Sequence, residues 1–260
     1  MKQTKENATS ANVSSIDKAF DIIDFLYDCG GEASIAEISK GLEMHKSTVY
    51  RILNAVKAAG YVYQNEDTLN YALGVRFYQI GMRLQNNENF LRAYVRYAKA
   101  LNEKYNEVIA VGTRELAVNN IPRYVELYGF RSRHSLTRRM ETGEYSLSHC
   151  TASGKCLLAF SRDSYLSRFD GCELQRLTQY TITDWTQLKL ELEKIRRQGY
   201  AIDNEECELG LCGIAAPLFA QNGNVVGEIS LTLPVERFRM MDVTEVIKDL
   251  KEISALRLEI

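Results

Sequence analysis

Residues 34–53 contain two short amphipathic patterns separated by a tight turn, and this feature constrains the fold more than any other. Ser34 and Glu37 have the spacing of a capping box at the start of the first pattern, and Gly41 allows the chain to turn after it. In the second pattern, apolar residues recur at the spacing of one buried helix face: Val49, Ile52, Leu53 and Val56. The segment therefore predicts a helix-turn-helix.

The second helix leaves a polar face that suits the major groove of DNA. Hydroxyl, amide and guanidinium groups on such a face reach base edges, and a lysine binds phosphate. The predicted DNA-binding residues are Lys46, Ser47, Thr48, Tyr50, Arg51 and Asn54. Two β-like runs at 61–63 and 71–73, joined by a turn-rich stretch, predict a wing. The first expectation is a winged helix-turn-helix that binds double-stranded DNA.

Charge limits how this chain binds DNA. The net charge is −2, with 32 basic and 34 acidic side chains, so the whole chain is not an unselective polyanion binder. Any affinity for DNA must be local, and a weakly basic domain gains from dimerisation because two copies double the phosphate contacts. We therefore expect a homodimer on a palindromic operator.

The chain divides into four segments by pattern. Residues 1–12 are polar without periodicity and are expected to be a disordered arm, followed by the winged helix-turn-helix at 13–74 and linker helices at 75–105. From 106 to 260, strand and helix patterns alternate, which predicts an α+β sheet domain. Because no apolar run has the length of a secretory signal or membrane span, we expect a cytoplasmic protein with no membrane partner.

Several short motifs together resemble a known family. They are SHCTASGKCLLA at 148–159, QGYAIDNEE at 198–206, GIAAP at 213–217, ISLTLP at 229–234 and KSTVYRIL at 46–53. The ordered set, from about residue 13 to the end of the chain, resembles the IclR family of bacterial transcriptional regulators. The resemblance implies a C-terminal effector-binding domain of GAF-like α/β fold, and assembly as dimers or dimers of dimers. It also implies that the effector is a small carboxylate or an aromatic acid.

Carried over by position, the resemblance also implies an effector pocket. Its residues would be Thr151, Ala152, Ser153, Gly154, Asp203, Gly213, Ser230 and Thr232. Backbone N–H groups at a helix N-terminus bind anions, and hydroxyls at alternate strand positions face the same side. The sequence departs from the family where a pocket cysteine is often found: Gly213 holds that position, and Cys212 falls one place earlier, on the opposite strand face.

Enzyme and metal chemistry lack their usual signals. The six cysteines form no C-x-x-C pair, there are only three histidines, and no nucleotide-binding, zincin or hydrolase motif occurs. We therefore expect no catalytic residues, no metal and no cofactor. Two alternatives stay open: a thiol redox sensor using Cys207 and Cys212, and a GAF-like enzyme with an attached DNA-binding domain. The basic run at 131–139 is either a solvated loop or contains an arginine that binds a ligand carboxylate or an acidic partner surface.

The sequence thus predicts a ligand-responsive, DNA-binding transcriptional regulator, with repression as its expected action.

Overall fold

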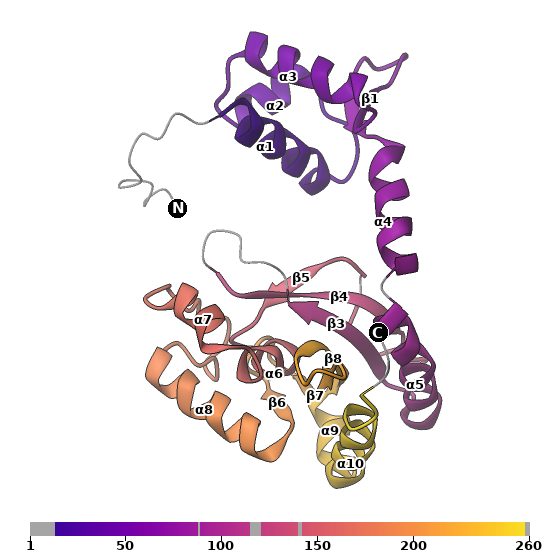
Figure 1. Ribbon diagram of the computed structural model, residues 1–260, viewed down its shortest axis with the longest axis vertical. Coiled ribbons are helices and arrows are strands. Elements are labelled where there is room, and N and C mark those ends of the chain that lie inside the picture. Colours follow the sequence, from indigo (N-terminus) through magenta and orange to yellow (C-terminus); the bar gives the residue numbers. More distant parts are fainter. Residues whose placement is uncertain (1–13, 88, 115–120, 140–141, 258–260) are drawn as a thin grey trace. The chain divides into compact units, whose positions relative to one another are not determined.

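The computed structural model describes residues 14–87, 89–114, 121–139 and 142–257 (Figure 1). The predicted arm at 1–12 lies outside the described residues. Contacts divide the chain between Asn87 and Glu88 into two compact units, each of which is described by itself below. Within the described ranges, no helix combines the length and the apolar character needed to span a bilayer.

The N-terminal unit is a winged helix-turn-helix followed by a helix. Its elements are, in chain order, α1 (Ser15–Asp28), α2 (Ile35–Gly41), α3 (Lys46–Ala58), β1 (Val62–Gln64), β2 (Tyr71–Leu73) and α4 (Val75–Asn87). Its core is formed by apolar residues of the three first helices and the wing, including Ile22, Leu26, Ile38, Val49 and Leu53. The predicted helical patterns and the two wing strands are confirmed.

Two capping boxes fix where the first helices begin, as the sequence predicts. Ser14 accepts from the backbone N–H of Asp17, whose carboxylate accepts from the Ser14 N–H at 2.9 Å. Glu37 accepts from the Ser34 N–H at 2.8 Å in the same way. Each box satisfies N–H groups that a helix start leaves without partners, so α1 and α2 begin at defined residues.

The wing is held to the loop before α2 by one carboxylate. Glu32 accepts a hydrogen bond from the Asn65 side-chain amide at 2.6 Å and another from the Thr68 hydroxyl at 2.7 Å. Backbone bonds between Ala33 and Tyr71 extend this connection, at 2.8 and 2.9 Å. The wing hairpin is thereby fixed relative to the helix-turn-helix.

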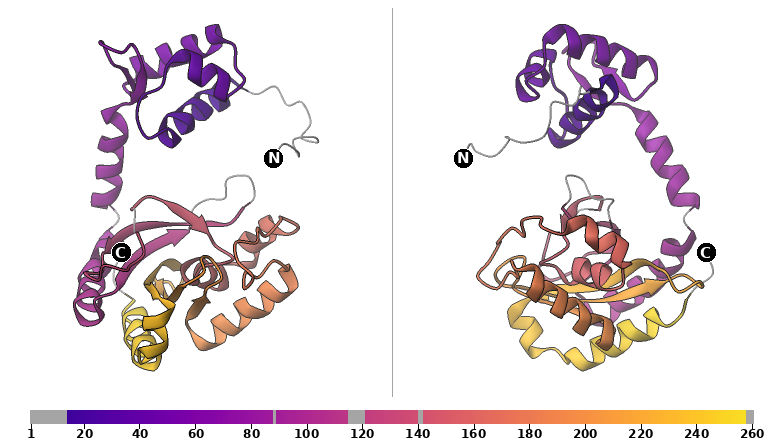
Figure 2. Two further views of the ribbon diagram at one scale, coloured as in Figure 1. Left: turned by 180° about the vertical axis from the view of Figure 1, so that it is seen from behind. Right: turned by 60° about the vertical axis from the view of Figure 1, so that its left-hand side comes forward.

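The C-terminal unit is a six-stranded antiparallel sheet between two helical layers, in the strand order β5-β4-β3-β8-β7-β6 (Figure 2). Its strands are β3 (Val108–Arg114), β4 (Arg123–Phe130), β5 (Tyr145–Leu147), β6 (Ala201–Asn204), β7 (Leu211–Phe219) and β8 (Val225–Pro234). Its helices are α5 (Asn89–Tyr105), α6 (Ala152–Ala159), α7 (Asp163–Leu166), the 3-10 helix η1 (Ser167–Phe169), α8 (Trp185–Gln198), α9 (Val235–Met240) and α10 (Val243–Ser254).

Side-chain alternation along the strands builds a core on each face of the sheet. On β8, Ile229, Leu231 and Leu233 pack against α5 and α10. On the opposite face, Ala201 and Ala215 pack against α6 and α8. The α+β fold class is confirmed, whereas the short elements β5 and α9 were not predicted: three residues at a sheet edge and six directly after Pro234 carry too little periodicity.

The approach of α6 to its preceding loop depends on Gly154. A methyl group at this position would overlap the backbone of Ser148, whose carbonyl oxygen would lie 2.5 Å from the added carbon. The neighbouring atoms are backbone, so they have little freedom to move away. Gly154 therefore sets how closely α6 packs against the loop that leads into it.

We predict that Gly154→Ala lowers the free energy of unfolding of this unit by about 1–3 kcal/mol, through overpacking. Trp185 of α8 is the only tryptophan of the chain, so denaturant unfolding followed by its fluorescence reports on this unit. Gly213→Ala is the matched control, because its added carbon meets its nearest neighbour at an ordinary 3.4 Å. Equal stability of the two variants would contradict the role given to Gly154.

Candidate functional site

Helix α3 presents the polar face that the sequence predicts. Its buried side is formed by Val49, Ile52 and Leu53. The residues of the opposite side that are exposed are Lys46, Ser47, Tyr50, Arg51 and Asn54. Thr48 differs from this group because it is half-buried, and its N–H donates to the His45 carbonyl in the first turn at 2.9 Å. Five of the six predicted DNA-binding side chains thus share one accessible surface.

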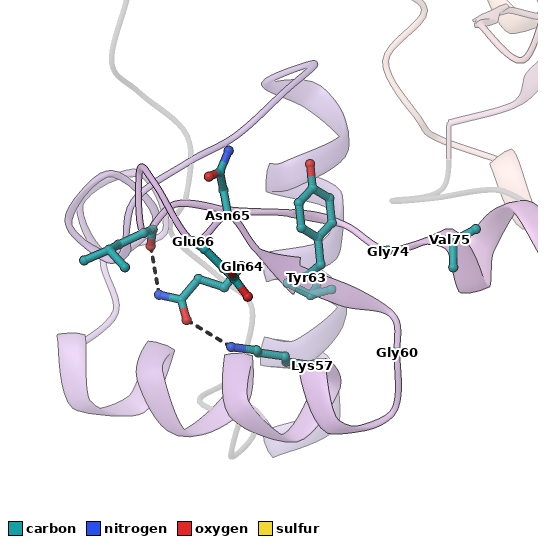
Figure 3. Close-up of a pocket in the computed structure, with 10 residues that line it drawn as sticks. Lys57, Gly60, Tyr63, Gln64, Asn65, Glu66, Gly74 and Val75 are labelled. Atoms are coloured by element: carbon teal, nitrogen blue, oxygen red, sulfur yellow. Dashed lines mark hydrogen bonds between the residues drawn. The ribbon is translucent and has the colours of Figure 1, made fainter.

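A groove lies between the C-terminal end of α3, the wing and the start of α4, with a volume of about 560 Å³ (Figure 3). Lys57 Nζ donates to Gln64 Oε1 at 3.0 Å, and Gln64 Nε2 donates to the Leu69 carbonyl at 3.0 Å. These bonds connect α3 to both sides of the wing. Lys57 was not among the predicted site residues; its place on the polar face of α3, at the end nearest the wing, is the signal that points to it.

A second, smaller cavity lies in the C-terminal unit, between the N-terminus of α6 and the sheet. Asp203, Gly213 and Thr232 are register partners on β6, β7 and β8, so they form one row across the sheet beneath α6. The volume of the cavity is about 50 Å³. It is lined by Tyr124, Arg138, Ser146, Thr151, Ala152, Ser153, Asp203, Cys207, Glu208, Leu211, Gly213 and Thr232.

Most of the predicted pocket residues meet at this cavity. Those that line it are Thr151, Ala152, Ser153, Asp203, Gly213 and Thr232. Gly154 instead packs against Ser148, and its N–H donates to the Thr151 hydroxyl at 3.1 Å. Ser230 is buried two positions before Thr232 on the same strand face and lies beside Glu228. Gly154 and Ser230 therefore support the cavity without lining it.

The basic run supplies one arginine to the cavity. Arg138 makes an ion pair with Glu126, and the Tyr124 hydroxyl donates to the same carboxylate oxygen at 3.1 Å. Burial beside Glu126 raises the pKa of the Tyr124 hydroxyl above its ordinary value. Tyr124 thus stays protonated, and the guanidinium of Arg138 faces the cavity. Arg138 is therefore held by Glu126 of the same chain at the cavity wall, and the binding of a ligand carboxylate by an arginine of the run stays a prediction.

Asp203 is buried, and loss of hydration raises the pKa of its carboxyl to about 7. Its Oδ1 accepts from the Glu206 N–H at 2.8 Å, which offsets part of that shift. The side chain of Glu206 makes a buried ion pair with Lys155 of α6. Near neutral pH, the Asp203 carboxyl therefore exchanges between an anionic acceptor and a neutral hydrogen-bond donor.

The cysteine contacts differ from the predicted pair. Cys212 is buried on β7, where its thiol donates to Asn204 Oδ1 of the neighbouring strand at 3.4 Å. Cys207 lies in the connection between β6 and β7, where it is half-buried and lines the cavity. A redox pair of Cys207 and Cys212 would need both thiols to be accessible, and the burial of Cys212 disfavours this alternative.

The described residues contain no group of three or more histidine, cysteine and acidic side chains that could hold a metal ion.

A winged helix with an accessible polar recognition face, joined to a sheet domain with a polar cavity, defines a class of DNA-binding regulators. Family comparison identifies the family within it. Residues 15–66 match the IclR helix-turn-helix domain, and residues 82–256 match the bacterial transcriptional regulator IclR C-terminal domain. The chain belongs to the IclR family of bacterial transcriptional regulators, as the motifs predicted, and is a transcription regulator rather than an enzyme.

Individual relatives agree with this assignment. The chain is 35% identical to the HTH-type transcriptional regulator KdgR of Escherichia coli K12 over 87% of this chain and 84% of that protein. It is 28% identical to the DNA-binding transcriptional repressor YiaJ of the same organism, over 97% of this chain and 88% of that protein. Among solved structures, the Thermotoga maritima IclR is 28% identical with a TM-score of 0.68, covering 92% of this chain and 95% of that one.

Glu228 is the most deeply buried acid beside the cavity, with no exposed surface. Neither of its carboxyl oxygens has a hydrogen bond of normal geometry among the described residues, although the Ser153 and Ser230 hydroxyls lie near enough to lower its pKa slightly. Burial dominates, followed by the repulsion from Glu126, and raises the pKa of Glu228 to about 8. The folded protein therefore holds this proton at neutral pH.

We predict that Glu228→Gln reduces the loss of stability that the protein suffers as the pH rises. The unfolded chain releases the Glu228 proton near pH 4 and the folded protein only near pH 8, so stability falls as the pH rises through this interval. Glutamine cannot ionise and removes this part of the slope. Trp185 fluorescence unfolding at pH 5.5 and pH 8 measures it. Glu252→Gln, whose side chain is 65% exposed, is the control and should keep the wild-type slope.

Proposed function

We propose that this protein is a repressor that binds a palindromic operator as a homodimer, or a dimer of dimers, and responds to a small carboxylate. The observation that carries the proposal is that a single chain joins the exposed polar face of α3 to a separate unit whose cavity meets six of the predicted pocket residues. The repressor assignment is supported by the name of the relative YiaJ. Because its DNA partner lies in the bacterial cytoplasm, the protein acts there.

Within the proposed DNA complex, α3 enters the major groove and the wing contacts the backbone. Arg51 and Asn54 are one turn apart on the exposed face of α3 and would read base edges. Lys46 at the first position of α3 would bind a phosphate. The hydrogen bond from Lys57 to Gln64 holds the wing to α3 and so fixes the position of the wing relative to these contacts.

We predict that Arg51→Ala weakens operator binding by about 1–3 kcal/mol and relaxes specificity at one position in each half-site. Lys46→Ala should weaken binding to all DNA alike and flatten the salt dependence by about one unit of slope. The measurement is fluorescence anisotropy on the DNA upstream of the gene, at several salt concentrations, with unrelated DNA as competitor.

Lys99→Ala is the control for the loss of a positive charge, because Lys99 is exposed on α5 in the other unit. Wild-type binding that unrelated DNA competes away equally well would contradict the operator proposal. A normal salt slope in Lys46→Ala would contradict its phosphate contact.

Apolar side chains on two helices of the N-terminal unit support dimerisation. On α1, Ile16 and Phe20 are 67% and 61% exposed and are one helical turn apart. On α4, Val75, Tyr78 and Met82 are exposed with the same periodicity. A monomer would leave these stripes in water, whereas a second copy of the unit would cover them.

The cavity chemistry favours a carboxylate that carries hydroxyl groups over an aromatic acid. Hydroxyls, carboxyls and a guanidinium make up most of the lining, and the exceptions are Ala152, Cys207, Leu211 and Gly213. The N–H groups of Ala152 and Ser153, at the start of α6, would receive the carboxylate of the effector. Asp203 and Thr232 would bind its polar groups from the sheet.

We predict that Thr232→Val weakens effector binding by about 0.5–1.5 kcal/mol, because valine keeps the shape and removes the hydroxyl that faces the cavity. Isothermal titration with a panel of small hydroxy acids, together with the shift of operator affinity that each one causes, measures the effect. Thr113→Val is the control, because the Thr113 hydroxyl bonds the Val226 carbonyl at 2.9 Å, outside the cavity. Equal losses in both variants would contradict a direct contact with Thr232.

A further inference from the structure

Two glutamates lie on the α6 face of the sheet, on the same face as Thr232. Glu228 and Thr232 are an even number of positions apart on β8, so their side chains point to the same side. Glu126 of β4 and Glu228 are both register partners of Gly112 on β3, and directly opposite residues share a face. A methyl group on Gly112 would lie 3.0 Å from Glu228 Oε1. The glycine therefore leaves room for the Glu228 carboxyl between the sheet and α6.

The wall of the effector cavity touches this acid pair, Glu126 and Glu228. The Tyr124 hydroxyl lines the cavity and donates to Glu126 Oε1 at 3.1 Å. Arg138 also lines the cavity and makes an ion pair with the same oxygen. Glu126 keeps 3% of its surface exposed and Glu228 none, and neither residue lines the cavity itself. The acid pair therefore lies directly behind the wall formed by Tyr124 and Arg138.

Three oxygens of the acid pair have no hydrogen-bond partner within the described residues. They are Glu126 Oε2, Glu228 Oε1 and Glu228 Oε2. Burial of an acceptor without a hydrogen bond costs free energy, so folded proteins seldom keep such atoms without a ligand or a water molecule. Tyr124 and Arg138 both approach Oε1 of Glu126, which leaves Oε2 for a group from outside the chain. The acid pair is therefore an acceptor site that the chain itself does not fill.

The other end of the cavity offers donors instead of acceptors. The N–H groups of Ala152 and Ser153 are at the start of α6, and Ala152 lies over Gly213: a methyl group on Gly213 would meet Ala152 Cβ at 3.4 Å. Gly213 is the register partner of Thr232. From Thr232 to Glu228, β8 covers about 13 Å at about 3.3 Å per residue. A ligand that binds both ends therefore has an extended chain, with a carboxylate at one end and hydrogen-bond donors at the other.

We propose that Glu126 and Glu228 form an inner subsite that binds the hydroxyl groups of a polyhydroxy monocarboxylate, whose carboxylate lies at the start of α6. This inference rests on the proposed effector function. Because the cavity in this conformation measures only about 50 Å³, Tyr124 and Arg138 move aside when such a ligand reaches the acid pair. Burial and the charge of Glu126 raise the pKa of Glu228, so at neutral pH its protonated carboxyl both donates to and accepts from a ligand hydroxyl.

The subsite rejects two other classes of acid. An alkyl carboxylate brings no hydrogen-bond donors, so the buried oxygens stay unsatisfied in its complex. A dicarboxylate places its second charge beside Glu126, and Arg138 is already paired with that glutamate. The repulsion between like charges disfavours this complex. The effector is therefore a hydroxylated acid with a single carboxylate.

The test is isothermal titration of the full-length protein with gluconate, hexanoate and glucarate, which have carbon chains of equal length. Gluconate should bind more tightly than either of the others, by roughly tenfold or more. Equal affinities of gluconate and either other acid would overturn the subsite, while the carboxylate site of the proposed function would stand. Failure of all three acids to bind would overturn both.

The variant Glu228→Met separates the acid pair from the other polar groups of the cavity. Methionine keeps the length of the side chain and removes both oxygens, so gluconate should bind roughly tenfold more weakly and hexanoate as in the wild type. The free energy of unfolding, followed by Trp185 fluorescence, should not fall, because an apolar side chain replaces an unsatisfied buried acid. Unchanged gluconate affinity would mean that only water occupies the subsite, and would overturn the proposal.

Two further variants and a control complete the test. Glu228→Gln should keep the gluconate affinity within about twofold, because an amide donates and accepts as the protonated acid does. Glu126→Gln should raise the affinity for glucarate relative to gluconate, because the repelling charge is removed. An unchanged ratio would overturn the proposal, and this ratio decides it if Glu228→Met does not fold. Glu252→Met is the control: this side chain is 65% exposed on α10, and the variant should bind all three acids like the wild type.

Discussion

The contact between Gly154 and the Ser148 backbone determines how α6 lies over the sheet, and the cavity depends on that distance. If α6 lay farther away, the row formed by Asp203, Gly213 and Thr232 would open to solvent. Water would then lower the raised pKa of Asp203, since loss of hydration is its main cause. One side chain of minimal size therefore sets the dimensions and the electrostatics of the cavity.

The buried acidic side chains beneath α6 oppose folding. Their ion-pair partners show which of these carboxyl groups the protein compensates. Glu126 is paired with Arg138, and Glu206 with Lys155. Glu228 has no such partner among the described residues and stays protonated instead. A buried carboxyl without an ion pair lowers the stability of the fold. An apolar residue at the same position would avoid this cost, and it would be expected there if the role of the position were purely structural. Such residues are expected where a polar ligand binds, because the ligand completes their hydrogen bonds.

The sequence predicted the elements whose periodicity is long and whose ends carry caps. Both capping boxes, α3, and the strands that carry Asp203, Gly213 and Thr232 could be located this way, and the motifs supplied the family. The sequence could not reveal contacts made across the fold. Spacing suggested Cys207 with Cys212, but Cys212 is buried on β7 and its thiol donates to Asn204 of the neighbouring strand. The sequence did not separate Arg138 from the other arginines of the basic run. The structure does, because Arg138 makes an ion pair with Glu126.

The size of the cavity constrains how an effector could change DNA binding. A volume of about 50 Å³ holds a few water molecules, so this conformation does not contain space for a metabolite. A ligand shifts an equilibrium only through its different affinities for the two states, and a closed cavity gives it almost no affinity for one of them. Even an effector that makes few contacts would therefore bind the open state much more tightly than the closed state.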